Sequence, residues 1–314
     1  MFQICKKKST ILTFSFMCLI TIKSIAAIKT LKIQNGRYVS YETNSVGQNE
    51  KPTLILLPTL LRGWTENDEF VKILKKENIN FVTIHYSLQP ESILKIPKTE
   101  LPYVTANSYQ ISDLSSEVEH VIRKLNLKQP IIVGTNYSSV VTTEFAQNRK
   151  YSPILNVAPM IRFDESTPSG GPLTDFWINF FNLNPISGTI ITKWYLKQTY
   201  TQYWSEIVDQ LILSNSNFQN KQIRETLIAS YTEMSMMIHG FDFINQDFSN
   251  GIVRLFILGG NEDHPRYNSQ IEAISKYQRD SGQNHTTVVI PQAGHLLPTD
   301  NPREFVRILK TLIK

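Results

Sequence analysis

The chain has 314 residues, of which 41% are apolar and 19% are charged. This length suits one large α/β domain with an insertion, and this composition is typical of a folded globular protein, which excludes bulk disorder. The formal net charge is +5, but residues 1–26 hold four of the 32 Lys and Arg and none of the 27 Asp and Glu, so the rest carries 28 minus 27, or +1. With no basic cluster and no phosphate-binding motif after residue 27, we expect no nucleic-acid partner.

The first 26 residues have the pattern of a secretory signal peptide. Lys6 to Lys8 give a positive start, an uncharged and mostly apolar run follows from Thr10 to Ile22, and a small residue, Ala26, ends the segment. We therefore expect a mature protein of residues 27–314 that is secreted or periplasmic. An uncleaved N-terminal anchor is the alternative, although the run is short for a membrane span, and we expect no stable span after cleavage.

The only two cysteines, Cys5 and Cys18, both lie in that segment. The mature chain then holds no disulfide and no thiolate metal site. No other metal or cofactor motif stands out, so we expect neither a metal nor a cofactor. The core alone has to stabilise the fold.

Strand and helix patterns alternate along the rest of the chain. Asn35-Gly36 between two alternating runs, 31–34 and 37–42, predicts a β-hairpin, because both residues tolerate positive φ. The later apolar runs are short and uninterrupted, as in strands buried on both faces of a parallel sheet. We expect such strands at 53–57, 81–84, 131–133, 154–157, 253–258 and 287–290, and helices at 70–76, 111–125, 137–147, 265–280 and 302–313.

This alternation predicts an α/β fold with a mostly parallel sheet and helices on both faces. Residues 160–245, approximately, lack a clear buried strand and carry aromatic residues at mostly helical spacing. We expect this insertion to form a helical cap, and Trp177 and Phe181 to contact a ligand; packing within the cap is the alternative. In open α/β sheets ligands bind at the carboxyl ends of the strands, so functional residues should follow the predicted strands directly.

Three short motifs follow predicted strands in this way. Gly134-Thr135-Asn136-Tyr137-Ser138 leads from a strand straight into a helix, Asp263 follows the penultimate strand, and Gly294-His295 follows the last. Together they resemble the nucleophile elbow, the acid and the histidine of the α/β hydrolases, in the order of that family. The resemblance extends from the hairpin to the last helix and implies the α/β-hydrolase fold with a cap.

The resemblance also implies a role for each matched residue. Asp263 would orient the imidazole, and His295 would take the proton of a nucleophile. Asn136 stands where the family has its serine, and a carboxamide has no ionisable proton near neutral pH and is a poor nucleophile. We therefore expect ordinary serine-hydrolase activity to be absent.

The oxyanion side also departs from the family pattern. Pro58-Thr59 stands where His-Gly is usual, although backbone N–H groups can still serve, and by position these are the amides of Thr59, Leu60 and Tyr137. His85 ends a predicted strand in the same region. It is a candidate ligand contact, with a structural role as its alternative.

These observations predict a secreted α/β-hydrolase-like protein with a pocket for a small apolar or ester-like molecule, without ordinary serine-hydrolase activity. Two alternatives stay open. One is an enzyme of the same fold that uses His295 as general base without a covalent step. The other is an active esterase-like hydrolase, through Ser138 or Ser139, through water activated by His295, or through deamidation of Asn136 to Asp. The sequence does not indicate the ligand or the oligomeric state.

Overall fold

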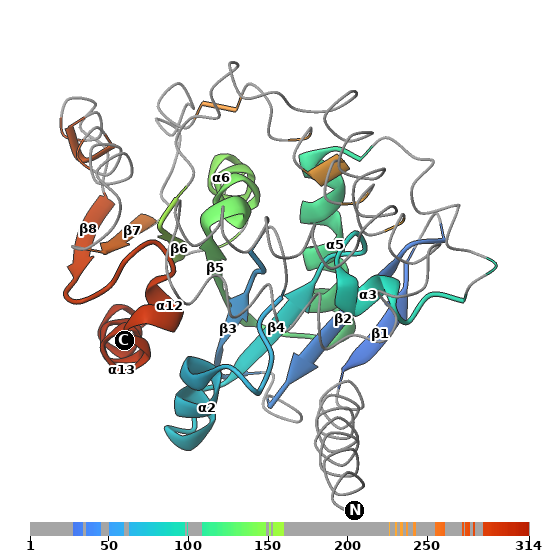
Figure 1. Ribbon diagram of the computed structural model, residues 1–314, viewed down its shortest axis with the longest axis horizontal. Coiled ribbons are helices and arrows are strands. Elements are labelled where there is room, and N and C mark those ends of the chain that lie inside the picture. The colour runs from blue at the N-terminus through green and yellow to red at the C-terminus, as the bar shows by residue number, and fades with distance from the viewer. Residues whose placement is uncertain are drawn as a thin grey trace, which may run out of the picture.

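The computed structural model (Figure 1) describes residues 28–33, 36–44, 50–59, 63–97, 99, 109–148, 151, 153–159, 226, 230, 233–234, 237, 241–242, 255–260, 272, 274–276, 279 and 285–313. The predicted signal peptide and nearly all of the predicted cap lie outside these residues. So do four candidate site residues: Leu60, Trp177, Phe181 and Asp263.

The strands of the described residues form one eight-stranded sheet in the order β1-β2-β4-β3-β5-β6-β7-β8. The β1–β2 hairpin and the β2–β4 pair are antiparallel, and every pair from β4 to β8 is parallel. The predicted hairpin and mostly parallel sheet are therefore confirmed. The strands are β1 (Lys29–Lys32), β2 (Tyr38–Thr43), β3 (Pro52–Leu56), β4 (Phe81–His85), β5 (Gln129–Thr135), β6 (Ile154–Val157), β7 (Leu255–Gly260) and β8 (His285–Ile290).

Helices cover both faces of the sheet (Figure 1). One face carries α3 (Pro90–Ile93), α5 (Ile111–Lys124) and α6 (Ser139–Gln147), and the other α2 (Glu69–Lys76), α12 (Leu297–Asp300) and α13 (Pro302–Leu312). A one-turn 3-10 helix, η2 (Asn136–Ser138), connects β5 to α6.

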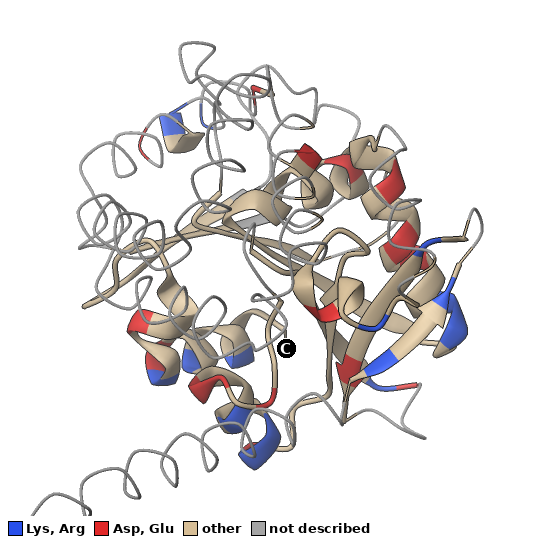
Figure 2. Cartoon of the chain, turned by 45° about the vertical axis from the view of Figure 1, so that its right-hand side comes forward, with Lys and Arg blue, Asp and Glu red and all other residues tan. Residues whose placement is uncertain are grey.

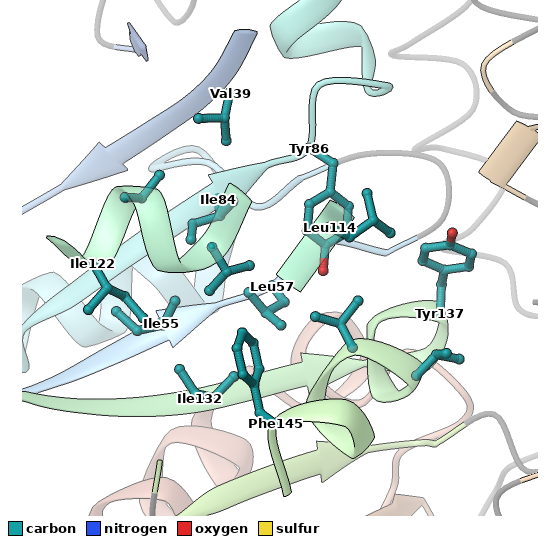
Figure 3. Close-up of a cluster of buried hydrophobic side chains, with 14 of the residues drawn as sticks. Val39, Ile55, Leu57, Ile84, Tyr86, Leu114, Ile122, Ile132, Tyr137 and Phe145 are labelled. Carbon is teal, nitrogen blue, oxygen red and sulfur yellow. The ribbon is translucent and has the colours of Figure 1, made fainter. Parts of the chain in front are cut away.

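The alternation of side chains along each strand divides the core into two clusters. In β3, Ile55 faces α5 and α6, whereas Leu54 and Leu56 face α2 and α13. On the second face Phe70 of α2 packs edge-on against Phe305 of α13, with ring centroids 5.8 Å apart. Figure 3 shows the first cluster, which includes two tyrosines that follow strands, Tyr86 after β4 and Tyr137 after β5. Both faces are thus buried, as the uninterrupted apolar runs require.

A salt bridge joins the hairpin to α5. Figure 2 shows acidic residues of α5 beside basic residues of the hairpin, and Nη2 of Arg37, which directly precedes β2, lies 2.8 Å from Asp113 Oδ1. Arg37 also stacks over the ring of Tyr109, 4.5 Å from its centroid. These contacts hold the antiparallel edge of the sheet against the helix that precedes β5.

Glu117 of α5 is a fully buried carboxyl group below this bridge. The backbone N–H of Ser87 donates to Oε2 at 2.9 Å, and the Ser87 hydroxyl donates to Oε1. Burial raises the pKa of Glu117 to about 7, because desolvation outweighs the two hydrogen bonds, which favour the charged form. A carboxyl group that holds its proton near neutral pH therefore links α5 to the loop after β4.

This carboxyl group should make stability depend on pH. Between its ordinary pKa of 4.5 and about 7, the folded chain binds a proton that the unfolded chain releases. The free energy of unfolding should therefore fall as pH rises through this window, by up to about 1.4 kcal/mol per pH unit. Glu117→Gln should remove this contribution, so that the difference between wild type and variant changes with pH. Urea unfolding at several pH values measures it.

Glu119→Gln, a partly exposed position on the same helix, controls for the loss of one charge. Parallel stability profiles for wild type and Glu117→Gln across the window would contradict the assignment.

Candidate functional site

The turn between β5 and α6 has the geometry of an elbow. Asn136 adopts a left-handed backbone conformation with φ of 51°, which Asn tolerates better than most residues. A Cβ on Gly134 would lie 2.5 Å from Thr142 Cγ2 and 2.7 Å from the carbonyl oxygen of Ser138. The chain can therefore turn this sharply only because position 134 has no side chain, and Asn136 stands at the apex of the turn.

The structure brings Asn136 and His295 into direct contact. Asn136 Nδ2 donates to His295 Nε2 across 159 positions of the sequence. Because an amide NH₂ only donates, the imidazole accepts through Nε2 and carries its proton on Nδ1. This is also the tautomer that would accept a proton from a serine at position 136.

His295 lies in the tight segment between β8 and α12. Its side chain is only 2% exposed, whereas Asn136 is partly exposed. The N–H of the preceding residue, Gly294, donates to Asp300 Oδ2 at 2.8 Å, and Gln292 adopts a φ of 52°. A carboxylate on α12 thus helps to hold the segment that presents the imidazole.

Ser138 is fully buried, and its hydroxyl forms hydrogen bonds with Pro58 and Tyr86. It donates to the carbonyl oxygen of Pro58, so the Tyr86 hydroxyl, 3.0 Å away, donates to Ser138. Ser139 is also fully buried. Ser138 therefore connects the elbow to the segment after β3.

The segment after β3 holds one of the predicted oxyanion amides. Thr59 is 4% exposed, and its carbonyl oxygen accepts a 2.6 Å hydrogen bond from Gln89 Nε2. Gln89 Oε1 accepts in turn from the N–H of Tyr86 at 3.1 Å. Strands β3 and β5 are parallel neighbours, and the Leu57 N–H donates to the carbonyl oxygen of Val133 at 2.8 Å. The segments that lead to Thr59 and to Tyr137 therefore leave the sheet at the same edge.

His85 lies beneath the same segment and is fully buried. A Cβ on Gly63 would lie only 1.9 Å from its Nδ1, so the imidazole packs directly against that glycine. Glu91 Oε2 lies 3.7 Å from Nδ1, and neither ring nitrogen has a hydrogen-bond partner among the described residues. Contact of His85 with a ligand remains a prediction.

Sequence reasoning missed two residues of this region, Tyr86 and Gln89. A signal was present, since polar groups directly follow the buried strand β4. Their hydrogen-bond partners, Ser138 and Thr59, are distant in sequence and cannot be predicted from the spacing of residues along the chain. Within the described ranges, no group of three His, Cys, Asp or Glu residues could hold a metal ion, and no helix has the length and apolar character to cross a membrane.

The fold is shared with many solved hydrolase structures. They include MGS-M2, an alpha/beta hydrolase enzyme from a Medee basin deep-sea metagenome library (15% identity, TM-score 0.57, 90% of this chain and 96% of that chain). An esterase from Exiguobacterium antarcticum matches at 13% identity with a TM-score of 0.60, over 91% of this chain and 98% of that chain. A bromoperoxidase from Bacillus anthracis matches at 13% identity with a TM-score of 0.60, over 91% of this chain and 99% of that chain. No family model and no curated protein matches the sequence. At these identities the likeness shows the fold and not the activity.

The elbow geometry makes a stability prediction for Gly134→Ala. The added methyl group overlaps Thr142 Cγ2 and the Ser138 carbonyl, so we expect a loss of about 1–3 kcal/mol in the free energy of unfolding. Thr142→Ser removes the overlapping methyl and keeps the hydroxyl that donates to Ser139. In the Gly134→Ala background it should restore part of the loss, because the backbone overlap remains. Chemical denaturation of the four proteins measures the coupling, and strict additivity would contradict it.

Proposed function

Because the chain has the α/β-hydrolase fold, we propose that it is a ligand-binding member of that fold without ordinary serine-hydrolase activity. It binds a small apolar or ester-like molecule at the elbow and acts outside the cytoplasm after removal of residues 1–26. The observation that carries the proposal is the contact between Asn136, at the nucleophile position, and His295.

The chemistry of this contact supports a site without turnover of esters. The carboxamide cannot give up a proton near neutral pH, so it forms no acyl intermediate. While this contact is made, the carboxamide also occupies the Nε2 lone pair, so water reaches that base only when the amide rotates away. This weighs against rapid turnover by a water-activating hydrolase or by an enzyme that uses His295 as a free base.

The surroundings of Ser138 and Ser139 weigh against a substitute nucleophile. Both residues are fully buried, and the Ser138 hydroxyl is already bonded to Pro58 and Tyr86. Its use as a nucleophile would break both hydrogen bonds and leave a buried carbonyl group unsatisfied, at a cost of about 1–3 kcal/mol.

The retained groups suit recognition of a carbonyl compound. The amide of Asn136 and the backbone amides near Thr59 and Tyr137 are donors for a carbonyl oxygen, as in an oxyanion hole. Ligand pockets combine a few such polar groups with apolar walls, which here would come from the predicted cap. A small ester-like molecule matches this combination.

The decisive experiment restores the nucleophile. We expect wild type to be silent on short and medium p-nitrophenyl esters and Asn136→Ser to hydrolyse them, because a serine hydroxyl would then meet His295 Nε2. His295→Ala in that background should reduce the rate by about 10²–10⁴-fold, as expected for loss of a general base. Initial rates and labelling by an active-site-directed phosphonate measure both effects.

Ser138→Ala is the matched control for a substitute nucleophile. Ester hydrolysis by wild type that disappears in Ser138→Ala would overturn the proposal in favour of an active enzyme. Binding is measured separately, since a ligand that binds the folded chain raises the melting temperature of wild type by an amount that grows with ligand concentration and affinity.

A further inference from the structure

We propose that Asn136 is the site of a self-catalysed modification, in which His295 assists water in hydrolysing the side-chain amide to a carboxylate. The inference starts from the same contact but does not depend on ligand binding. In this reaction His295 acts once in each chain, on Asn136, and does not turn over a substrate repeatedly.

The first argument is proximity. The imidazole of His295 is buried and held by its loop, and its Nε2 contacts the amide nitrogen that would leave. Asn136 itself is partly exposed, so water can reach its carboxamide. A base fixed beside a reacting group replaces a collision in solution with an oriented contact, which strongly raises the rate of an otherwise slow step.

The second argument is that the reaction balances with water as the only co-reactant. When the amide rotates enough to admit water, Nε2 takes a proton from it while the water oxygen bonds to Cγ of Asn136. The imidazolium returns that proton to Nδ2, the C–N bond breaks and ammonia leaves. The products are a side-chain carboxylate and ammonium, and nothing is oxidised or reduced.

The third argument is that the fold disfavours the ordinary route of deamidation. That route needs the main-chain nitrogen of Tyr137 to attack Cγ of Asn136 and close a five-membered ring. Tyr137 is fully buried within η2, and the backbone at Asn136 is held at φ of 51° by the sharp turn. Direct hydrolysis, by contrast, requires no movement of the backbone.

The product would change the chemistry of the site. A carboxylate at the apex of the elbow, beside an imidazole, is a group that can act as a nucleophile, whereas the amide cannot. The proposed binding function would then belong to the chain whose amide at position 136 is intact, before this conversion.

Peptide mass mapping of the full-length protein tests this inference. Wild type and His295→Gln are incubated in ¹⁸O-water at neutral pH and sampled over days, with Asn136→Asp as the reference. In wild type we expect Asn136 to become normally linked aspartate with one ¹⁸O in its side chain. In His295→Gln the conversion should be at least about 100-fold slower, the lower range for loss of a general base.

Asn35, which precedes Gly36, is an internal control, because it reacts through the ring route and should convert equally in both proteins. Wild type unfolded in urea is a second control and should lose the fast conversion at position 136, which separates an effect of the folded site from an effect of the variant on folding.

Three outcomes would each overturn the inference: an intact amide at position 136 after Asn35 has converted, isoaspartate at position 136, or an equal rate in His295→Gln. None of them bears on the ester-hydrolysis assay of Asn136→Ser, so the two proposals fail independently.

Discussion

The left-handed turn at Asn136 is the constraint on which the site depends. Its φ of 51° is possible because Gly134 has no Cβ to overlap Thr142 and the Ser138 carbonyl. The turn ends β5 and starts α6 within a few residues, so Asn136 lies just beyond the edge of the sheet. In this position its amide contacts His295, which follows β8, the third strand from β5 in the sheet.

The parallel sheet supplies the second condition. Because β5 and β8 run in the same direction, the segments that follow them leave the sheet at the same edge. Apolar side chains on both faces fix the register of these strands, since a slip by one residue would exchange the two core clusters. The core therefore determines the position of the site, although no core side chain takes part in the proposed chemistry.

Much of this architecture could be predicted from sequence because it follows from local patterns. The apolar runs predicted the parallel strands, and the segment around Gly134 and the Gly294-His295 pair indicated the two strand ends at which the structure brings Asn136 and His295 together. The hydrogen bonds of Ser138 to Pro58 and Tyr86, and the packing of His85 against Gly63, could not be predicted. These contacts join residues that are distant in sequence, and neither local spacing nor propensity indicates which partner a buried polar group will bond to. The short helices α3 and α12 were missed for a related reason, since four residues are too few for a periodic pattern.

The structure separates the groups that shape the elbow from the group that would perform hydrolysis. Gly134, Ser138, Tyr86 and Pro58 maintain the turn and the segment after β3, and none of them needs a nucleophile at position 136. His295 is different, because burial takes its imidazole out of water, and a hydrogen bond to a partner compensates for that loss. Asn136 is such a partner, and it binds the same ring nitrogen that a serine would use. Asparagine at position 136 therefore keeps a hydrogen bond to the histidine at the turn, while its carboxamide has no proton that ionises near neutral pH.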